Sequence, residues 1–325
     1  MEQTRINLSD FSDKVNEVRD KIGEVIVGNK YQVDMLLTAI LAGGHVLLEG
    51  VPGTAKTLLA RLTARLIDSR FSRVQFTPDL MPSDVLGTTV FNMKDGEFNF
   101  HPGPVFADIV LVDEVNRAPA KTQAALFEVM EERQVTIDGT THAMSDIYTI
   151  IATQNPVEQE GTYPLPEAQV DRFMLKVVVD YPKKEEEKLI IRMNNTGEFP
   201  HPDAVVTPEE IVRARNVVRE VYMDEKIERY IVDIVFATRN PEEYGLKGLK
   251  DLISYGGSPR ASISLSAAAK AYAFIKRRGY VIPEDVRAVC PEVLRHRIGL
   301  TYEAEAENVS TEEIISQVIN AVVVP

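Results

Sequence analysis

One segment near the N-terminus restricts the possible folds more than any other part of the chain. A short apolar run at residues 45–49 is closed by a glycine-rich loop, and a helical pattern of apolar residues at 57–66 follows directly. A run this short, bounded by glycine, predicts a buried strand rather than a helix. The loop consists of Gly50, Val51, Pro52, Gly53, Thr54, Ala55, Lys56 and Thr57. The segment therefore predicts a strand–loop–helix unit of a parallel α/β fold.

The loop has the residue types that bind phosphate. The P-loop pattern is glycine, four residues, glycine, lysine, and serine or threonine. Its backbone N–H groups surround an anion at the positive end of a helix, while Lys56 reaches the β- and γ-phosphates and Thr57 suits Mg²⁺. Ala55 replaces the second glycine; it is the smallest departure from glycine and is compatible with right-handed helical angles, so we expect the loop to tolerate it. Residues 50–57 are therefore predicted to bind ATP with Mg²⁺; the alternative is a chance strand–turn–helix.

Two acidic residues end the apolar run at 109–112. A buried strand that delivers Asp113 and Glu114 at its carboxyl end points them into the crevice where α/β sheets bind ligands. Asp113 would hold Mg²⁺, directly or through water, and Glu114 would polarise an attacking water. The alternative is a strand that runs out into solvent.

The remaining patterns extend this unit into a sheet. Apolar runs at 73–76, 109–112, 147–152 and 175–179 predict parallel strands buried on both faces, and helical patterns between them predict an open α/β sheet. Two alternating segments, 88–100 with a turn at Lys94-Asp95-Gly96 and 134–144 with Asp138-Gly139, predict hairpin inserts. Beyond Pro182 the patterns are mainly helical. We therefore predict a nucleotide-binding core at 1–182 and a helical domain at 183–325.

Charge and composition exclude several classes of protein. The net charge of −13 argues against a general nucleic-acid binder. The first residues lack the pattern of a signal peptide, and no apolar run approaches the ~20 residues that span a bilayer. The single cysteine, Cys290, suits a reducing compartment and is interpreted as a small buried residue. We expect a cytoplasmic protein without membrane insertion.

Taken together, the motifs resemble those of the AAA+ ATPases, and within them the MoxR family. The matching stretches follow the expected order over most of the chain, at residues 50–57, 112–118, 152–156, 165–173 and 257–261. Alanine before the loop lysine is common in that family. The resemblance implies a five-stranded parallel sheet flanked by helices, two hairpin inserts and a C-terminal helical lid.

The resemblance also implies roles for further residues. Asn155 would be the polar sensor that orients water against the γ-phosphate, and an amide can both accept and donate hydrogen bonds there. Arg172 would be the arginine finger offered to the nucleotide of a neighbouring subunit, with Arg117 and Arg133 as alternatives; local surface pairing is the other interpretation of Arg172. Arg260 would be a second sensor in the lid. Val27 and Gly28 would contact adenine, unless Gly28 simply ends a helix.

The implied function is that of an ATPase that assembles into a homo-oligomer, expected to be hexameric, and remodels or matures a protein partner. For the MoxR family such partners include von Willebrand factor A domain proteins. Phe91, Phe98 and Phe100 on the first hairpin are either contact residues or its own small core. The alternative function is an ATP-dependent assembly switch that hydrolyses little ATP, and a DNA motor of the same fold is disfavoured by the negative charge.

Overall fold

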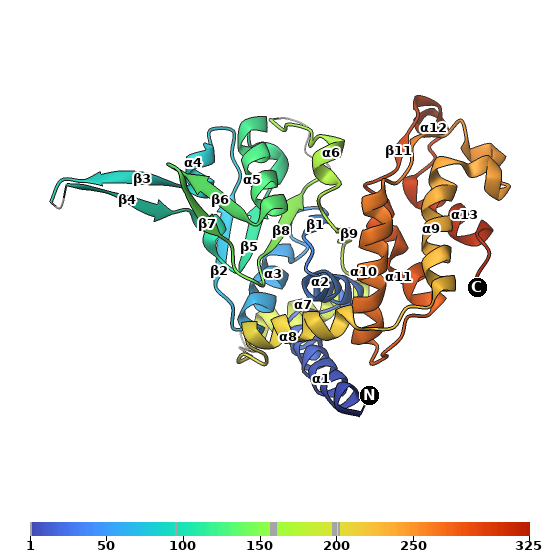
Figure 1. Cartoon of the computed structure of the whole chain (residues 1–325), viewed down its shortest axis with the longest axis horizontal. Coiled ribbons are helices and arrows are strands. Elements are labelled where there is room, and N and C mark those ends of the chain that lie inside the picture. Colours follow the sequence, from blue (N-terminus) through green and yellow to red (C-terminus); the bar gives the residue numbers. More distant parts are fainter. Residues whose placement is uncertain (1, 95, 157–160, 197–199, 201) are drawn as a thin grey trace.

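The computed structural model describes residues 2–94, 96–156, 161–196, 200 and 202–325. Its centre is a parallel sheet of five strands in the order β2-β5-β8-β1-β9 (Figure 1). The strands are β1 (Val46–Glu49), β2 (Phe71–Gln75), β5 (Ile109–Asp113), β8 (Thr149–Gln154) and β9 (Leu175–Val178). The predicted five-stranded α/β sheet is confirmed, and each apolar run lies within three residues of its strand.

Both faces of the sheet are buried, as the uninterrupted apolar runs require. On β1, Val46 and Leu48 join a hydrophobic cluster that extends into the N-terminal and C-terminal helices. Leu47, between them, joins a separate cluster with Phe127 and Phe173. Successive side chains of a strand point to opposite faces, so the alternation places one cluster on each face of the sheet.

Helices cover the sheet and build the C-terminal part of the chain (Figure 1). Those of the first half are α1 (Glu2–Val25), α2 (Lys30–Ala42), α3 (Lys56–Leu66), α4 (Pro82–Leu86), α5 (Ala120–Glu132) and α6 (Glu167–Val170). Those of the second half are α7 (Lys184–Thr196), α8 (Pro208–Arg219), α9 (Glu225–Arg239), α10 (Pro259–Ile275), α11 (Pro283–Leu294), α12 (Tyr302–Ala306) and α13 (Thr311–Ala321). A small antiparallel pair, β10 (Ile253–Tyr255) and β11 (Gly299–Leu300), lies among the latter. We call residues 225–321, from the start of α9 to the end of α13, the lid.

Ser12 and Asp13, followed by an amphipathic pattern at residues 14–25, predict a capped helix that begins there, and this prediction is wrong. Helix α1 continues through this position to Glu2, and the Ser12 hydroxyl donates to the carbonyl oxygen of Phe274 at 2.8 Å. A buried serine that bonds to a distant helix gives the same sequence signal as a cap. Cys290 is fully buried, as predicted. Among the described residues, no helix combines the length and the apolar character needed to cross a membrane.

Both predicted hairpins are present. The first pairs β3 (Gly87–Asn92) with β4 (Glu97–Pro102) and projects from the body of the molecule (Figure 1); Asp95 of its predicted turn lies outside the described residues. The second pairs β6 (Gln134–Ile137) with β7 (Thr140–Ala143).

The three phenylalanines of the first hairpin separate into two environments. Phe100 stacks on His142 of the second hairpin with ring centroids 4.3 Å apart, so it belongs to a small core at the hairpin base. Phe91 and Phe98 pair at 5.0 Å further out, where they are 48% and 73% exposed. Only the outer pair is therefore available for contact with another molecule.

The predicted domain boundary at residue 182 stays a prediction. Helix α8 packs against α1 and α2, and α7 lines a cavity beside the phosphate-binding loop. The hydrophobic cluster of Val46 and Leu48 continues from α1 to α13. The core and the lid are thus joined by continuous apolar packing.

Candidate functional site

The phosphate-binding loop opens a cleft of about 400 Å³ at the carboxyl ends of the central strands. Strands β5, β8 and β1 are adjacent in the sheet, which brings together side chains far apart in the sequence. The residues that line the cleft are Pro52, Gly53, Thr54, Ala55, Lys56, Thr57, Leu58, Arg73, Gln75, Asp113, Glu114, Thr153, Gln154 and Asn155. The structure therefore assembles Lys56, Thr57, Asp113, Glu114 and Asn155 in one cleft, as their predicted roles require.

The backbone conformation of the phosphate-binding loop and its close neighbours explain why the loop contains small residues. A Cβ at Gly50 would meet the carbonyl oxygen of Val179 at 2.3 Å, so only glycine fits beside β9. Gly53 has φ 83°, which glycine adopts without strain. Ala55 has φ 61° and ψ 18°, and the expectation of right-handed helical angles is wrong. The left-handed conformation at Ala55 is set by the entry of the loop into α3, and it is the reason glycine is the usual residue there.

Lys56 lies over the loop. Its ammonium donates to the carbonyl oxygens of Gly50 and Val51, both at 2.7 Å. Burial lowers the pKa of Lys56, whereas the nearby carboxylates of Asp113 and Glu114 act to raise it. One ammonium beside two carboxylates leaves a net negative charge in the cleft, so a phosphate chain would bind there together with a divalent cation.

Asp113 is held from two sides. It ends the buried strand β5, and its Oδ2 accepts from Arg73 Nε of β2 at 2.6 Å. Its Oδ1 accepts from the Thr153 hydroxyl of β8 at 3.1 Å. Neighbouring strands thus fix the carboxylate that was predicted to hold Mg²⁺.

Glu114 has a left-handed backbone, with φ 56° and ψ 52°. Its N–H donates to the Thr153 hydroxyl at 2.9 Å. Its carboxylate accepts from Gln75 Nε2 at 2.8 Å and forms an ion pair with Arg117 at 3.1 Å. Thr153 therefore binds the side chain of one acidic residue and the backbone of the next, which fixes the relative position of the two carboxylates.

Residues Arg73, Gln75 and Thr153 were not identified from the sequence. Polar residues at strand ends are common, and only the order of β2, β5 and β8 shows that these three contact the acidic pair.

A second cavity, of about 330 Å³, adjoins the cleft because residues 53–55 and Leu58 line both. Val27 lies in its wall, and its contact with adenine stays a prediction. Gly28 is absent from the lining among the described residues; a Cβ there would meet the Glu186 carboxylate at 2.9 Å, and φ is 76°. Helix α7 adds Ile190, Met193 and Asn194, which the sequence did not single out.

The donor set fits the cofactors that the motifs imply. The loop supplies backbone N–H groups and a lysine for phosphates, and the adjoining cavity has apolar walls for a base. Thr57 and Asp113 offer oxygen ligands, which Mg²⁺ prefers. Within the described part of the chain, no group of three or more acidic, histidine or cysteine side chains could hold a metal by itself. Mg²⁺ commonly binds through one or two carboxylates together with phosphate oxygens, so this set is sufficient.

Two predicted arginines lie away from this cleft. Arg172 donates from Nη1 to the carbonyl oxygen of Phe127 in α5 at 2.5 Å, and Arg260 pairs with Glu131 at the end of α5. Neither lines the cleft of its own chain within the described residues. Arg133, an alternative finger, donates to the carbonyl of Gly43, while Arg117, the other alternative, is engaged with Glu114.

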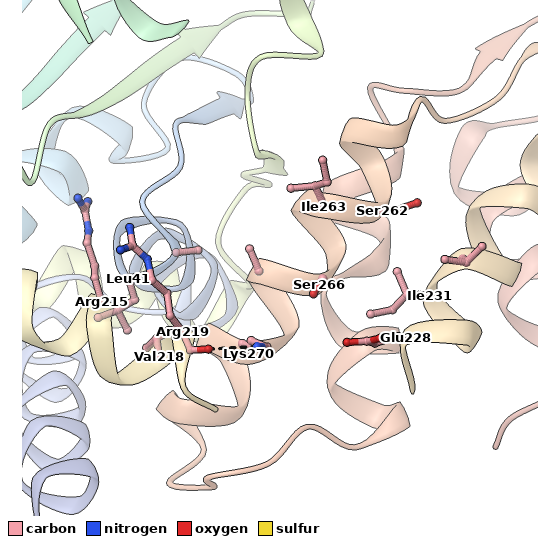
Figure 2. Close-up of a pocket in the computed structure, with 13 residues that line it drawn as sticks. Leu41, Arg215, Val218, Arg219, Glu228, Ile231, Ser262, Ile263, Ser266 and Lys270 are labelled. Atoms are coloured by element: carbon pink, nitrogen blue, oxygen red, sulfur yellow. Dashed lines mark hydrogen bonds between the residues drawn. The ribbon is translucent and has the colours of Figure 1, made fainter. Parts of the chain in front are cut away.

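Another groove, of about 450 Å³, lies between α2, α8, α9 and α10 (Figure 2). Arg215 and Arg219 come from α8, and Ile263 and Lys270 come from α10. Lys270 donates to the carbonyl oxygen of Arg219 at 3.1 Å, shown as a dashed line. Among the residues that the structure describes, this groove and the phosphate cleft have no lining residue in common, so the groove is a separate feature of the core–lid junction.

Comparisons with known proteins identify the class to which this fold belongs. Residues 45–175 match the model of the ATPase family associated with various cellular activities (AAA), and residues 249–318 match an AAA lid domain. The crystal structure of a putative ATPase from Cytophaga hutchinsonii superposes with a TM-score of 0.94 at 47% identity, over 100% of this chain and 98% of that one. The fold is therefore that of an AAA+ ATPase.

Proteins of similar sequence identify the family within the AAA+ class. The chain is 46% identical to Chaperone MoxR1 of Mycobacterium tuberculosis over 306 residues, which is 94% of this chain and 81% of that protein. It is 31% identical to Protein MoxR of Paracoccus denitrificans, over 93% and 94% of the two chains. The chain belongs to the MoxR family of AAA+ ATPases.

Proposed function

We propose that this protein is a Mg²⁺-dependent ATPase that assembles into a hexameric ring in the cytoplasm and remodels or matures a protein partner. The observation that carries the proposal is the convergence of Lys56, Asp113, Glu114 and Asn155 on one cleft, with Arg172 outside it. An ATPase that needs an arginine it does not supply to its own site requires a second subunit.

The residues of the cleft have separate proposed roles in ATP hydrolysis. The loop N–H groups and Lys56 bind the phosphates, and Thr57 and Asp113 would hold Mg²⁺, which neutralises charge on the transferring phosphoryl group. Glu114 orients the water and accepts its proton. Asn155 fixes that water against the γ-phosphate. Val27 and the apolar residues of α7 would bind the base.

The arginine of a neighbouring subunit would complete this site. Arg172 is the proposed finger, because a guanidinium that stabilises the transferring phosphoryl group accelerates the reaction by roughly 10³–10⁵-fold. Arg260, at the start of α10, is the proposed second sensor; its pairing with Glu131 leaves this role a prediction. The domain division at residue 182 is likewise retained as a proposal.

The proposed partner is a protein. A relative bears the name Chaperone MoxR1, and the resemblance to the MoxR family indicates von Willebrand factor A domain proteins. The exposed pair Phe91 and Phe98 on the projecting hairpin supplies an apolar surface for such a contact.

The variant Glu114→Gln tests the proposal. The amide keeps the shape of the side chain but cannot accept the proton, so ATP binding should persist while turnover falls by roughly 10²–10⁴-fold. Fluorescent-nucleotide titration measures the first quantity and phosphate release the second. Full turnover in this variant would show that Glu114 does not have the proposed role.

A slowly hydrolysing assembly switch is the second candidate. It is favoured by the engagement of the Glu114 carboxylate with Gln75 and Arg117 within the same chain. Phosphate release by the unaltered protein, measured with and without a von Willebrand factor A domain protein, separates the two functions. A switch would assemble with ATP and show low turnover under both conditions.

A further inference from the structure

The segment that carries Arg172 is bound by a buried arginine of the lid. Arg297, just beyond α11, is 4% exposed. Its Nε donates to Asp171 Oδ1 at 2.6 Å, and its Nη2 donates to the carbonyl oxygens of Asp171 at 2.9 Å and Phe173 at 2.7 Å. The two residues on either side of Arg172 are thus held by one guanidinium.

Other lid residues bind the same segment. The hydroxyl of Ser258, which caps α10, donates to Asp171 Oδ2 at 3.1 Å. His296 Nε2 donates to the carbonyl of Phe173 at 2.9 Å. Burial, together with the nearby Glu167 carboxylate of α6, raises the pKa of Tyr255 to about 12. Both carboxylate oxygens of Asp171 and the carbonyl of Phe173 are therefore engaged by the lid.

The adjacent part of the core–lid junction is more open. There the groove of Figure 2 separates part of α10 from α8, and Ile263 on its wall is 69% exposed. The lid is thus fixed to the segment 171–173 by directional polar bonds, whereas beside it the junction contains accessible space. A planar guanidinium with several bonded N–H groups fixes orientation as well as distance.

Buried ion pairs contribute little net stability compared with apolar packing, but they specify geometry. Arg172 lies between Asp171 and Phe173, so its backbone must move when the lid moves. Its guanidinium bonds to the carbonyl of Phe127 in α5, which belongs to the core. A shift of the lid would therefore change the reach of Arg172 relative to the core.

We infer that Arg297 is a positioning residue that couples the lid of one subunit to the finger offered to the next. The inference rests on the proposed role of Arg172 between subunits. It adds a regulatory link: the lid position in one subunit sets the rate of hydrolysis in its neighbour's site.

Two inactive subunits provide the test. A subunit with Glu114→Gln keeps its finger but has no active site, and a subunit with Arg172→Ala keeps its site but has no finger. Mixed rings should release phosphate where the first supplies Arg172 to the second. Arg297→Met is then placed in either subunit, and phosphate release is measured as kcat and KM.

In the finger-donating subunit, Arg297→Met should lower kcat by about 10- to 100-fold, because displacement by ~1 Å has that cost. In the subunit that already lacks Arg172, the same change should lower kcat less, because there it acts only through the position of its own lid and of Arg260. Equal losses in both subunits would overturn the inference, because they would show a structural role. Assembly with a non-hydrolysable ATP analogue and thermal unfolding are measured for every mixture.

Arg295→Met is the matched control. The Arg295 side chain is 9% exposed, and it donates to the carbonyl of Lys176 in β9 at 2.6 Å, away from residues 171–173. Arg295→Met should not lower kcat more in the finger-donating subunit than in the subunit that lacks Arg172. If Arg297→Met does not fold, Asp171→Asn, which keeps the side-chain shape, should show the same asymmetry, and its absence would equally overturn the inference. A lack of any activity in the starting mixture would instead refute Arg172 as the finger.

Discussion

The replacement of Thr153 by valine tests how the acidic pair is held. The Thr153 side chain is 3% exposed, and its hydroxyl bonds both to Asp113 Oδ1 at 3.1 Å and to the N–H of Glu114 at 2.9 Å. Valine fills the same volume but has no hydroxyl. The change therefore removes one bond to a charged group, worth about 1.5–3 kcal/mol, and leaves the N–H unsatisfied at about 1–3 kcal/mol.

The kinetic effect follows from the backbone of Glu114. Its left-handed conformation is sparsely populated in the absence of restraint, so loss of the N–H bond should let the carboxylate shift. A shift of ~1 Å lowers the rate about 100-fold, whereas ATP affinity should change by less than about threefold because Lys56 and the loop are untouched. Phosphate release and nucleotide titration measure the two effects.

Thr149→Val is the matched control on the same strand. The Thr149 hydroxyl donates to the carbonyl of Ile147 at 3.0 Å and accepts from Arg215 at 3.4 Å, at the opposite end of β8. The free energy of unfolding should fall by about 2.5–6 kcal/mol in Thr153→Val and by about 2–4 kcal/mol in Thr149→Val, but only Thr153→Val should lower kcat. Comparable kcat values in the two variants would refute the positioning role, and Thr153→Ser should restore activity.

Two further results are expected. Ala55→Gly should raise the free energy of unfolding, measured in urea, by about 1 kcal/mol. Glycine relieves the left-handed strain of about 1–2 kcal/mol, and this gain exceeds the stabilisation of the unfolded chain by its added conformational entropy. A lower free energy of unfolding would mean that Ala55 has right-handed angles. Burial, reinforced by Arg133, lowers the pKa of His45 to about 3. The unfolded chain then binds the extra proton below pH 6.5, so stability should fall by about 2 kcal/mol between pH 6.5 and 5. His45→Gln should reduce that slope in urea titrations at both pH values, and an unchanged slope would contradict the assignment.

Most strands of the sheet could be predicted because burial on both faces leaves a pattern within each short segment of sequence. Parallel strands buried on both faces produce uninterrupted apolar runs, and Asp-Gly turns signal hairpins. The loop and the acidic pair were found because phosphate and Mg²⁺ demand particular residue types at fixed spacing.

The errors arose where a distant contact decides the local structure. The cap at Ser12 failed because its hydroxyl bonds to Phe274, more than 200 residues later. The angles of Ala55 depend on how the loop enters α3, and those of Glu114 on Thr153. The sequence did not indicate that α7 lines the second cavity, because the helix begins with a run of charged residues and its apolar residues Ile190 and Met193 come later.

The first hairpin has a consequence for how this family can diversify. Its base is fixed by glycines 87 and 103, where a Cβ would clash with backbone, and by the Phe100–His142 stack. Its described outer residues, including Phe91 and Phe98, line neither the phosphate cleft nor the adjoining cavity. Substitutions at the tip therefore carry little cost in folding or ATP turnover. A partner contact at the proposed Phe91–Phe98 surface could therefore change without altering the residues of the phosphate cleft.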